Sequence, residues 1–183
     1  MSRTKDTIII KNKKKTIRNL YPTYIYDKVE DIPYELIKEQ DIKLLIFDMD
    51  NTLIDNKHTY SQDLKKWAAD MKEKGLLLYI LSNSPFGKVV QKIAKDLGMK
   101  YIYNAKKPFL NGFNKIQEET KIPKENIMMI GDQLFTDVWG GNRFGIKTLL
   151  VKRINKTETF ISRIKRPLEK IVLKRYYKNK GGM

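Results

Sequence analysis

The fold is decided by residues 44–52, LLIFDMDNT, in which a wholly apolar run turns abruptly polar. Four consecutive apolar residues are typical of a strand that is buried on both faces of a parallel sheet. The polar residues that follow, beginning with Asp48 and Asp50, are typical of a loop. We therefore predict a buried parallel strand over residues 44–47 that ends in a carboxylate-rich loop.

Strand-like and helix-like patterns alternate along the chain after this stretch. Ser61 can cap a helix whose apolar residues recur at helical spacing, with Gly75 just past its end. The same reasoning predicts helices over residues 89–97, 109–120 and 135–144, and further strands over residues 76–81, 101–103, 127–130 and 147–151. In the helix over residues 109–120, Phe109, Phe113 and Ile116 are expected to face inward. The alternation predicts an α/β fold with a doubly wound parallel sheet and right-handed crossovers.

The two ends of the chain differ from this pattern. Residues 21–42 contain Pro22 and Pro33 and are expected to form a lead-in with one short helix. Residues 157–177 carry apolar side chains at helical spacing among basic ones, which predicts a basic helix that Pro167 should kink or interrupt. We therefore expect a basic N-terminal arm over residues 1–20 and a single domain over residues 21–183.

The charge is concentrated at the two ends. The chain has 37 Lys and Arg against 21 Asp and Glu, for a net charge of +16. Residues 1–20 hold seven basic residues and one acidic residue, residues 147–183 hold twelve and two, and the 126 residues between them are balanced. Basic ends favour a polyanionic partner, either an anionic phospholipid membrane surface or a nucleic acid, although a basic tail is also compatible with a simple solvated end.

Composition excludes several classes of site. The chain has no Cys and only one His, His58, so disulfides, thiolate chemistry and multi-His metal sites are excluded. No stretch approaches the roughly 18 apolar residues of a spanning helix, and residues 1–20 lack the pattern of a secretory signal. We expect a cytoplasmic protein, and the sequence leaves its oligomeric state open.

Polar groups follow each predicted core strand. Asp48 follows the first strand, Ser82 and Asn83 the second, Lys107 closely follows the third, and Asp132 follows the fourth. Because the carboxyl ends of parallel strands share one edge of the sheet, these groups should converge there. Converging carboxylates need a cation, and all-oxygen ligands suit Mg²⁺. Backbone amides near Ser82, together with Lys107, would favour a bound phosphoryl group.

These residues resemble the four motifs of the haloacid dehalogenase (HAD) superfamily of phosphatases. The motif residues are Asp48-Met49-Asp50-Asn51-Thr52-Leu53, Ser82, Lys107-Pro108 and Gly131-Asp132-Gln133-Leu134-Phe135-Thr136-Asp137. The resemblance implies that Asp48 is the nucleophile and becomes an aspartyl phosphate, and that Asp50 is the general acid and base.

The same resemblance implies a metal site and a phosphate site. Asp48, the backbone carbonyl of Asp50, and Asp132 would hold Mg²⁺, with Asp137 as a further ligand or a partner of one. Ser82, Asn83 and Lys107 would orient the phosphoryl group.

The spacing of the motifs leaves no room for a cap domain. Only 31 residues separate Asp50 from Ser82, and only 24 separate Ser82 from Lys107, which suffices for one helix and one strand each time. The chain resembles the capless subfamily IIIA branch of the YqeG type, which is similar to phosphatidylglycerophosphate phosphatases. The supporting residues are 21–22, 42–43, 131–143, 158–159 and 166–169.

This branch implies a lipid phosphate substrate. The expected activity is Mg²⁺-dependent removal of the terminal phosphate of phosphatidylglycerophosphate, by a protein that lies peripherally on the inner membrane face. Two alternatives stay open at this point. One is a phosphatase for a soluble sugar or nucleotide phosphate, and the other is a non-catalytic module that binds RNA or the ribosome.

Overall fold

The structure is a computed structural model that describes residues 19–155 and 160–180. The described residues from Pro22 to Asn155 form one compact unit, and helix α7 belongs to a second unit with Leu20 and Tyr21. The predicted basic arm falls almost wholly outside the described residues. The predicted single domain over residues 21–183 stays a prediction.

Six parallel strands form one sheet in the order β1-β6-β5-β2-β3-β4. Strand β2, the LLIF run, lies in the middle, where Phe47 is in register with Ile80 of β3 and Ile130 of β5. The predicted doubly wound α/β fold is confirmed. The strands are β1 (Tyr24–Tyr26), β2 (Leu44–Phe47), β3 (Leu77–Leu81), β4 (Lys100–Ile102), β5 (Ile127–Gly131) and β6 (Lys147–Val151).

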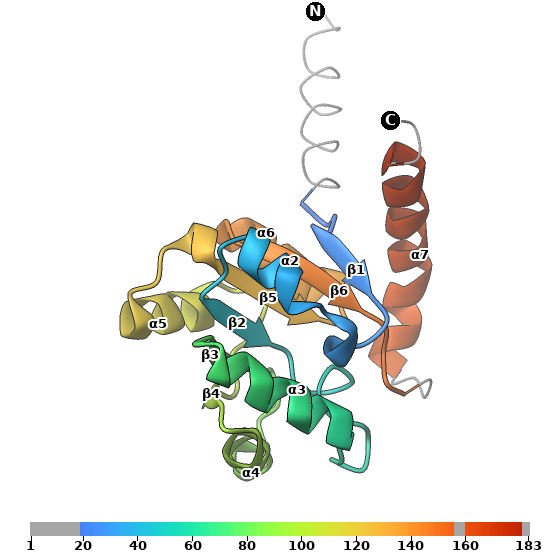
Figure 1. Cartoon of the computed structure of the whole chain (residues 1–183). Helices are drawn as coiled ribbons and strands as arrows, with labels where there is room; N and C mark the ends of the chain where they lie inside the picture. The colour runs from blue at the N-terminus through green and yellow to red at the C-terminus, as the bar shows by residue number, and fades with distance from the viewer. Residues whose placement is uncertain (1–18, 156–159, 181–183) are drawn as a thin grey trace, which may run out of the picture. The chain divides into compact units, whose positions relative to one another are not determined.

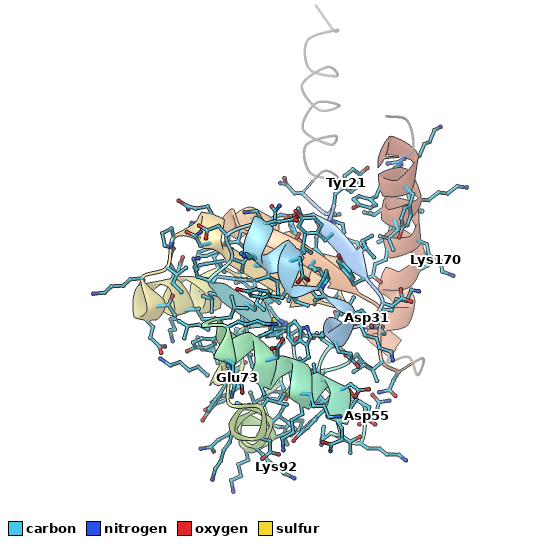
Figure 2. The ribbon with its side chains drawn as sticks, in the orientation of Figure 1. Tyr21, Asp31, Asp55, Glu73, Lys92 and Lys170 are labelled. Atoms are coloured by element: carbon cyan, nitrogen blue, oxygen red, sulfur yellow. The ribbon has the colours of Figure 1, made fainter. Side chains whose placement is uncertain are left out.

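Helices cover both faces of the sheet (Figure 1). Apolar side chains of α2 (Tyr34–Glu39), α3 (Gln62–Glu73) and α4 (Gly87–Leu97) pack in one core with one face of the strands. Those of α5 (Asn111–Thr120) and α6 (Trp139–Phe144) pack in the core on the other face. Charged residues such as Glu73 of α3 and Lys92 of α4 are exposed on the outside (Figure 2). Short 3₁₀ turns cover Val29–Asp31 and Lys124–Asn126.

Local signals explain where the helices begin and end. The Ser61 hydroxyl accepts a hydrogen bond from the Leu64 amide at 3.0 Å, which is the predicted N-cap of α3. Helix α4 ends at Gly98, whose φ of 64° is the left-handed conformation that glycine adopts without strain.

Three local predictions differ from the structure. Helix α5 begins at Asn111, and Phe109, which was expected to face inward, is exposed. The reason is a turn in which the Phe109 amide donates to the Lys106 carbonyl, so Phe109 precedes the helix. The predicted helix over residues 135–144 consists of a π-helical turn, Leu134–Val138, followed by α6. Strand β1 was not predicted.

Helix α7 (Phe160–Lys180) confirms the predicted C-terminal helix, but Pro167 does not interrupt it. Pro167 is exposed within the helix. Within this unit, the rings of Tyr21 and Tyr176 pack edge to face at 5.6 Å between centroids. None of the helices in the described ranges has the length and apolar composition that crossing a bilayer requires.

Candidate active site

The carboxyl ends of the central strands bring the predicted polar residues together. Asp48 directly follows β2, and its amide donates to the Ile130 carbonyl of β5 at 2.9 Å. This bond extends the sheet by one residue and fixes the start of the loop. Asp132 directly follows β5, and Ser82 directly follows β3. All three side chains are buried.

Lys107 connects two of the carboxylates. Its Nζ lies 2.6 Å from Asp48 Oδ1 and 2.8 Å from Asp137 Oδ1, and all three side chains are almost fully buried. Burial opposes the charge on the lysine, but the fields of Asp137 and Asp48 outweigh burial and raise the pKa of Lys107 above its ordinary value. Lys107 is therefore a fixed cation inside the site.

A third carboxylate completes an acidic cluster. Oxygen atoms of Asp48, Asp132 and Asp137 all lie within 4.8 Å of one another, and the three residues are buried. Asp132 Oδ1 has no hydrogen-bond partner among the described residues, although it is buried. A buried cluster of three carboxylates, one of them with an unpartnered oxygen, fits a hard divalent cation, because such cations prefer oxygen ligands. The described residues therefore fit the metal that the motifs imply.

Burial also governs the protonation of the cluster. Loss of water is the main cause that raises the pKa of Asp48 to about 6, although Lys107 opposes it. Burial and mutual repulsion likewise raise the pKa values of Asp132 and Asp137. A divalent cation would reverse this effect, because it stabilises the ionised carboxylates.

Asp137 owes its position to the π-helical turn. Its Oδ2 accepts a hydrogen bond from the Gln133 amide at 3.1 Å, which turns the carboxylate back toward the end of β5. The carboxylate then lies against Gly131, where a Cβ would approach Asp137 Oδ2 to 2.3 Å. Glycine is therefore required at position 131 for this approach.

Asp50 lies apart from the three-carboxylate cluster. It is only partly buried and occupies the start of a tight turn in which the Asn51 amide donates to the Ile54 carbonyl. Burial is the main cause that raises the pKa of Asp50 above its ordinary value, against the opposing fields of His58 and Lys107. Its predicted roles as acid, base and backbone metal ligand stay predictions.

Ser82 and Asn83 support the loop that carries Lys107. The Ser82 hydroxyl is fully buried and accepts a hydrogen bond from the Ser84 amide at 3.0 Å. The Asn83 side chain accepts from the Lys107 amide at 2.6 Å and donates to the Lys107 carbonyl at 3.1 Å. Asn83, which was predicted to bind phosphate, thus holds the backbone of the lysine in the structure. Direct phosphate binding by either residue stays a prediction.

Sequence reasoning missed Arg153. This residue follows β6, and its Nε donates to Asp132 Oδ2 in a short ion pair. The contact leaves Asp132 Oδ1 free to face the other carboxylates. Because β6 lies beside β5, Arg153 and Asp132 are neighbours on the sheet edge although they are 21 positions apart in sequence. Topology was the only signal that could have suggested Arg153, and no motif marks it.

Comparison with known proteins places this site in a family. Residues 45–112 match a model described as haloacid dehalogenase-like hydrolase, and residues 104–172 match a model described as HAD-hydrolase-like. "Probable phosphatase YqeG" of Bacillus subtilis (strain 168) is 36% identical over 153 residues, which cover 83% of this chain and 88% of that protein. The chain belongs to the haloacid dehalogenase-like hydrolases. The family resemblance predicted from the motifs is confirmed.

A second relative of this HAD hydrolase is more distant. "Phosphatidylglycerophosphate phosphatase 1, chloroplastic/mitochondrial" of Arabidopsis thaliana is 26% identical over 162 residues, which cover 79% of this chain. The match spans 44% of the length of that relative.

Solved structures support the HAD fold. An uncharacterized protein from Listeria monocytogenes serotype 4b has a TM-score of 0.51 at 19% identity, covering 73% of this chain and 99% of its own. A haloacid dehalogenase-like family hydrolase from Brucella suis 1330 has a TM-score of 0.50 at 11% identity, covering 69% and 92%. In this chain, one helix and one strand lie between Asp50 and Ser82, and one helix and one strand lie between Ser82 and Lys107, as predicted for a site without a cap.

Proposed function

We propose that this HAD hydrolase is a metal-dependent phosphomonoesterase that removes the terminal phosphate of phosphatidylglycerophosphate. The observation that carries the proposal is the position of Lys107, whose ammonium lies 2.6 Å from Asp48 and 2.8 Å from Asp137 beside the carboxylate of Asp132. An oxygen nucleophile, a fixed cation and a set of metal ligands around one point support transfer of a phosphoryl group.

Two carboxylates would divide the chemistry. An oxygen of Asp48 attacks phosphorus in line, the bond from phosphorus to the substrate oxygen breaks, and Asp50 donates its proton to that leaving oxygen. Asp50 then accepts a proton from water, which attacks phosphorus and releases phosphate and free Asp48. The raised pKa of Asp50 supports the first step, because a carboxylic acid must still hold its proton when the substrate oxygen leaves.

The remaining residues would hold charge and geometry. Lys107 orients the phosphoryl oxygens, and Asn83 fixes the backbone of Lys107 through two hydrogen bonds. Asp48, Asp132 and Asp137 would hold a divalent cation, for which we propose Mg²⁺. When bound, the cation supplies positive charge that offsets the developing charge on the phosphoryl oxygens.

Several observations support a lipid as the alcohol part of the substrate. A hollow of about 550 Å³ lies beside Arg153 and Thr52, with apolar walls that include Leu53 and Ile154. Since no cap domain covers the carboxyl edge within residues 19–155 and 160–180, a substrate with a large alcohol part has room to approach. The similarity to a protein named as a phosphatidylglycerophosphate phosphatase supports the same choice.

The basic C-terminal helix supports a membrane location. In the described part of α7, Lys170, Lys174, Arg175 and Lys178 are exposed. Each basic residue near an anionic bilayer contributes about 1 kcal/mol of binding free energy. We therefore propose a peripheral location on the inner membrane face, where the lipid substrate lies.

A phosphate-release assay tests the proposal. Purified protein is given phosphatidylglycerophosphate in detergent micelles, a sugar phosphate or a nucleoside monophosphate, with Mg²⁺ or with a chelator. We expect the highest kcat/KM for the lipid, loss of activity with chelator, and no activity in Asp48→Asn. A higher kcat/KM for a soluble ester would reject the lipid assignment and keep the phosphatase. If no phosphate is released from any of these esters, the assignment of phosphatase activity is rejected.

A further inference from the structure

Exposed aromatic residues lie on loops at the same edge of the sheet as the candidate active site. Five large apolar side chains of the described residues 22–155 are exposed, and four of them lie on loops that follow the carboxyl ends of strands. Phe86 and Phe109 are the most exposed, at 69% and 66%, and Tyr103 is 50% exposed. Leu77, at the start of β3, is the exception.

The loops that carry these rings are joined to one another and to the site. The Asn104 amide donates to the Ser84 carbonyl at 2.9 Å, which connects the loop after β4 to the loop after β3. The ring of Tyr103 lies against Gly87, where a Cβ would approach it to 3.1 Å. Phe109 lies two residues after Lys107, the cation of the site. The three rings therefore belong to one continuous surface.

These loops and the first turns of the helices that follow them are positively charged. Residues 83–88 and 103–115 contain four lysines and no Asp or Glu. Lys107 is buried against carboxylates, whereas Lys88, Lys106 and Lys115 are exposed. Although the charges of residues 21–146 balance overall, these two segments are locally cationic. We define the aromatic rim as the exposed side chains Phe86, Lys88, Tyr103, Lys106, Phe109 and Lys115.

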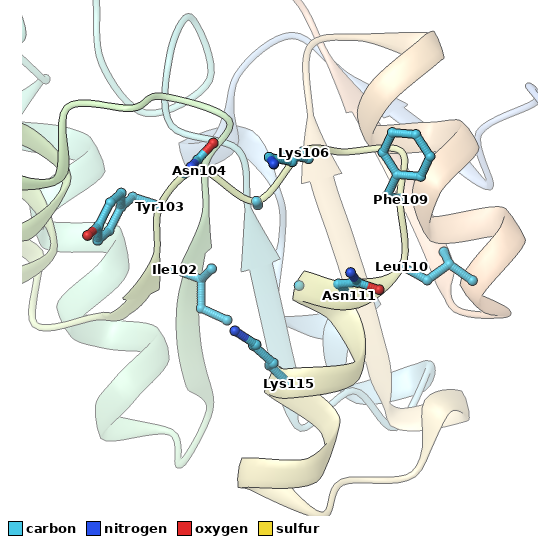
Figure 3. A pocket seen from close by; sticks show the side chains of 10 residues that line it. Ile102, Tyr103, Asn104, Lys106, Phe109, Leu110, Asn111 and Lys115 are labelled. Carbon is cyan, nitrogen blue, oxygen red and sulfur yellow. The ribbon is translucent and has the colours of Figure 1, made fainter.

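A hollow of about 370 Å³ lies within this surface (Figure 3). Its apolar walls come from Ile102, Phe109 and Leu110, and the ammonium groups of Lys106 and Lys115 belong to its lining. Apolar walls next to cationic groups match a phospholipid, which joins an anionic headgroup to acyl chains.

We propose that the aromatic rim is a docking surface for an anionic phospholipid bilayer, which sets the active site at the level of the headgroups. The inference rests on the proposed function, because it names the surface on which the lipid substrate is met. Phenylalanine side chains favour burial at the boundary of headgroups and acyl chains, while the lysines attract the anionic surface. A single-stranded RNA is the competing partner, since bases stack on exposed rings. The apolar hollow favours the lipid.

Tryptophan reporters test where the protein touches the bilayer. Phe86→Trp and Phe109→Trp are made in full-length Asp48→Asn protein, which keeps the lipid from being consumed, and Leu77→Trp is the control at the opposite edge of the sheet. Vesicles of phosphatidylcholine with 30% phosphatidylglycerol should shift the emission of the first two reporters to shorter wavelength by about 10 nm. Brominated lipids in the vesicles should quench that emission. Vesicles should change the emission of the Leu77→Trp protein no more than they change that of its Asp48→Asn parent.

Charge variants test the electrostatic part. Lys88→Gln/Lys106→Gln should weaken vesicle co-sedimentation about 25-fold, or about fivefold per lysine. Lys95→Gln/Lys121→Gln removes the same charge from the ends of α4 and α5 and should weaken it less than threefold. Thermal unfolding at unchanged midpoints confirms that all variants are folded.

Three results would overturn the docking surface. The first is unshifted emission of Phe86→Trp and Phe109→Trp on vesicles with which the protein sediments, and the second is an equal loss of vesicle co-sedimentation in both pairs of lysine variants. The third is a change in reporter emission with single-stranded RNA and none with vesicles. Failure of the proposed function is separate. If the reporters shift but wild-type protein releases no phosphate from the lipid in micelles, the docking surface stands and the substrate assignment falls.

Discussion

At the scale of single residues, Lys107 is the cation that contacts two carboxylates within the described part of the chain. Its ammonium is in place before any substrate arrives, because Asp48 and Asp137 hold it and Asn83 fixes its backbone. A charge that needs no rearrangement stabilises a transition state more effectively than a mobile one. In the proposed function, these contacts keep the Lys107 ammonium in position for the phosphoryl group.

We predict that Lys107→Met lowers kcat for a soluble phosphomonoester about 100-fold to 1000-fold, the usual cost of losing a preorganised electrostatic contact. The methionine side chain lacks the charge and keeps most of the volume of the lysine. Steady-state phosphate release measures the effect, and Lys95→Met on the outside of α4 is the matched control. Equal rates for the two variants would show that Lys107 only holds the loop.

Arg153 contacts Asp132, one of the three carboxylates for which we propose a metal ion. Removing the guanidinium leaves a buried carboxylate oxygen without its partner, which destabilises the metal-free protein by about 2 kcal/mol. We predict that Arg153→Ala lowers the midpoint of thermal unfolding by about 4–8 °C without metal. Mg²⁺ should raise the midpoint more in the variant than in wild type, because the metal becomes the cation nearest Asp132. A smaller rise in the variant would contradict this role.

Most of the residues that sequence reasoning could place directly follow strands, and Lys107 follows one closely. Asp48, Ser82 and Asp132 each come one position after an apolar run, so the parallel topology alone brings them to one edge. Arg153 follows a strand too, but its contact depends on β6 lying next to β5. The bonds of Asn83 to the Lys107 backbone depend on loop conformation, which no spacing specifies.

At the scale of elements, the long apolar patterns predicted the right strands and helices, whereas short elements were missed or assigned to the wrong class. Strand β1 has three half-buried residues, too few for a period to appear, and pairs with β6 as an edge strand. Thr23, just before it, accepts a hydrogen bond from the Thr148 amide through its hydroxyl. The π-helical turn Leu134–Val138 was expected as ordinary helix because both present similar apolar spacing.

The junction between β5 and the π-helical turn tolerates only a glycine. A Cβ at position 131 would meet the Asp137 carboxylate at 2.3–2.4 Å and the Asp137 Cβ at 2.5 Å, so Gly131→Ala must displace that side chain. We predict a loss of about 1–3 kcal/mol in the free energy of unfolding and a weaker rise in unfolding midpoint on adding Mg²⁺. Chemical denaturation and calorimetry measure both.

A double-mutant cycle separates this contact from a general backbone effect. An Asp137→Gly background removes the Cβ of residue 137 as well as its carboxylate, and with them the three side-chain atoms that the added methyl group would meet, so Gly131→Ala should cost much less there. Equal costs in both backgrounds would mean that the glycine serves the backbone and not the carboxylate.

At the scale of the whole molecule, folding forces buried carboxylates together at one edge of the sheet. Asp48, Asp132 and Asp137 have pKa values above those of an unfolded chain, mainly because of burial. Without metal, the cluster therefore stabilises the folded state at low pH, where the carboxylates are protonated. This contribution is complete below about pH 4 and is lost as pH rises through about 6, the pKa of Asp48.

We predict that metal-free protein unfolds at a temperature about 5 °C higher at pH 5 than at pH 7.5. Mg²⁺ should reverse the order, because it binds the ionised carboxylates and competes with protons at pH 5. Exposed acids with lowered pKa values, such as Asp41 and Asp55, act in the opposite direction but titrate below pH 4. Differential scanning calorimetry with Mg²⁺ or chelator measures the four midpoints. Asp137→Asn, which removes one of the three charges, should flatten both trends, and an equal rise on adding Mg²⁺ at pH 5 and pH 7.5 would exclude the cluster as the metal site.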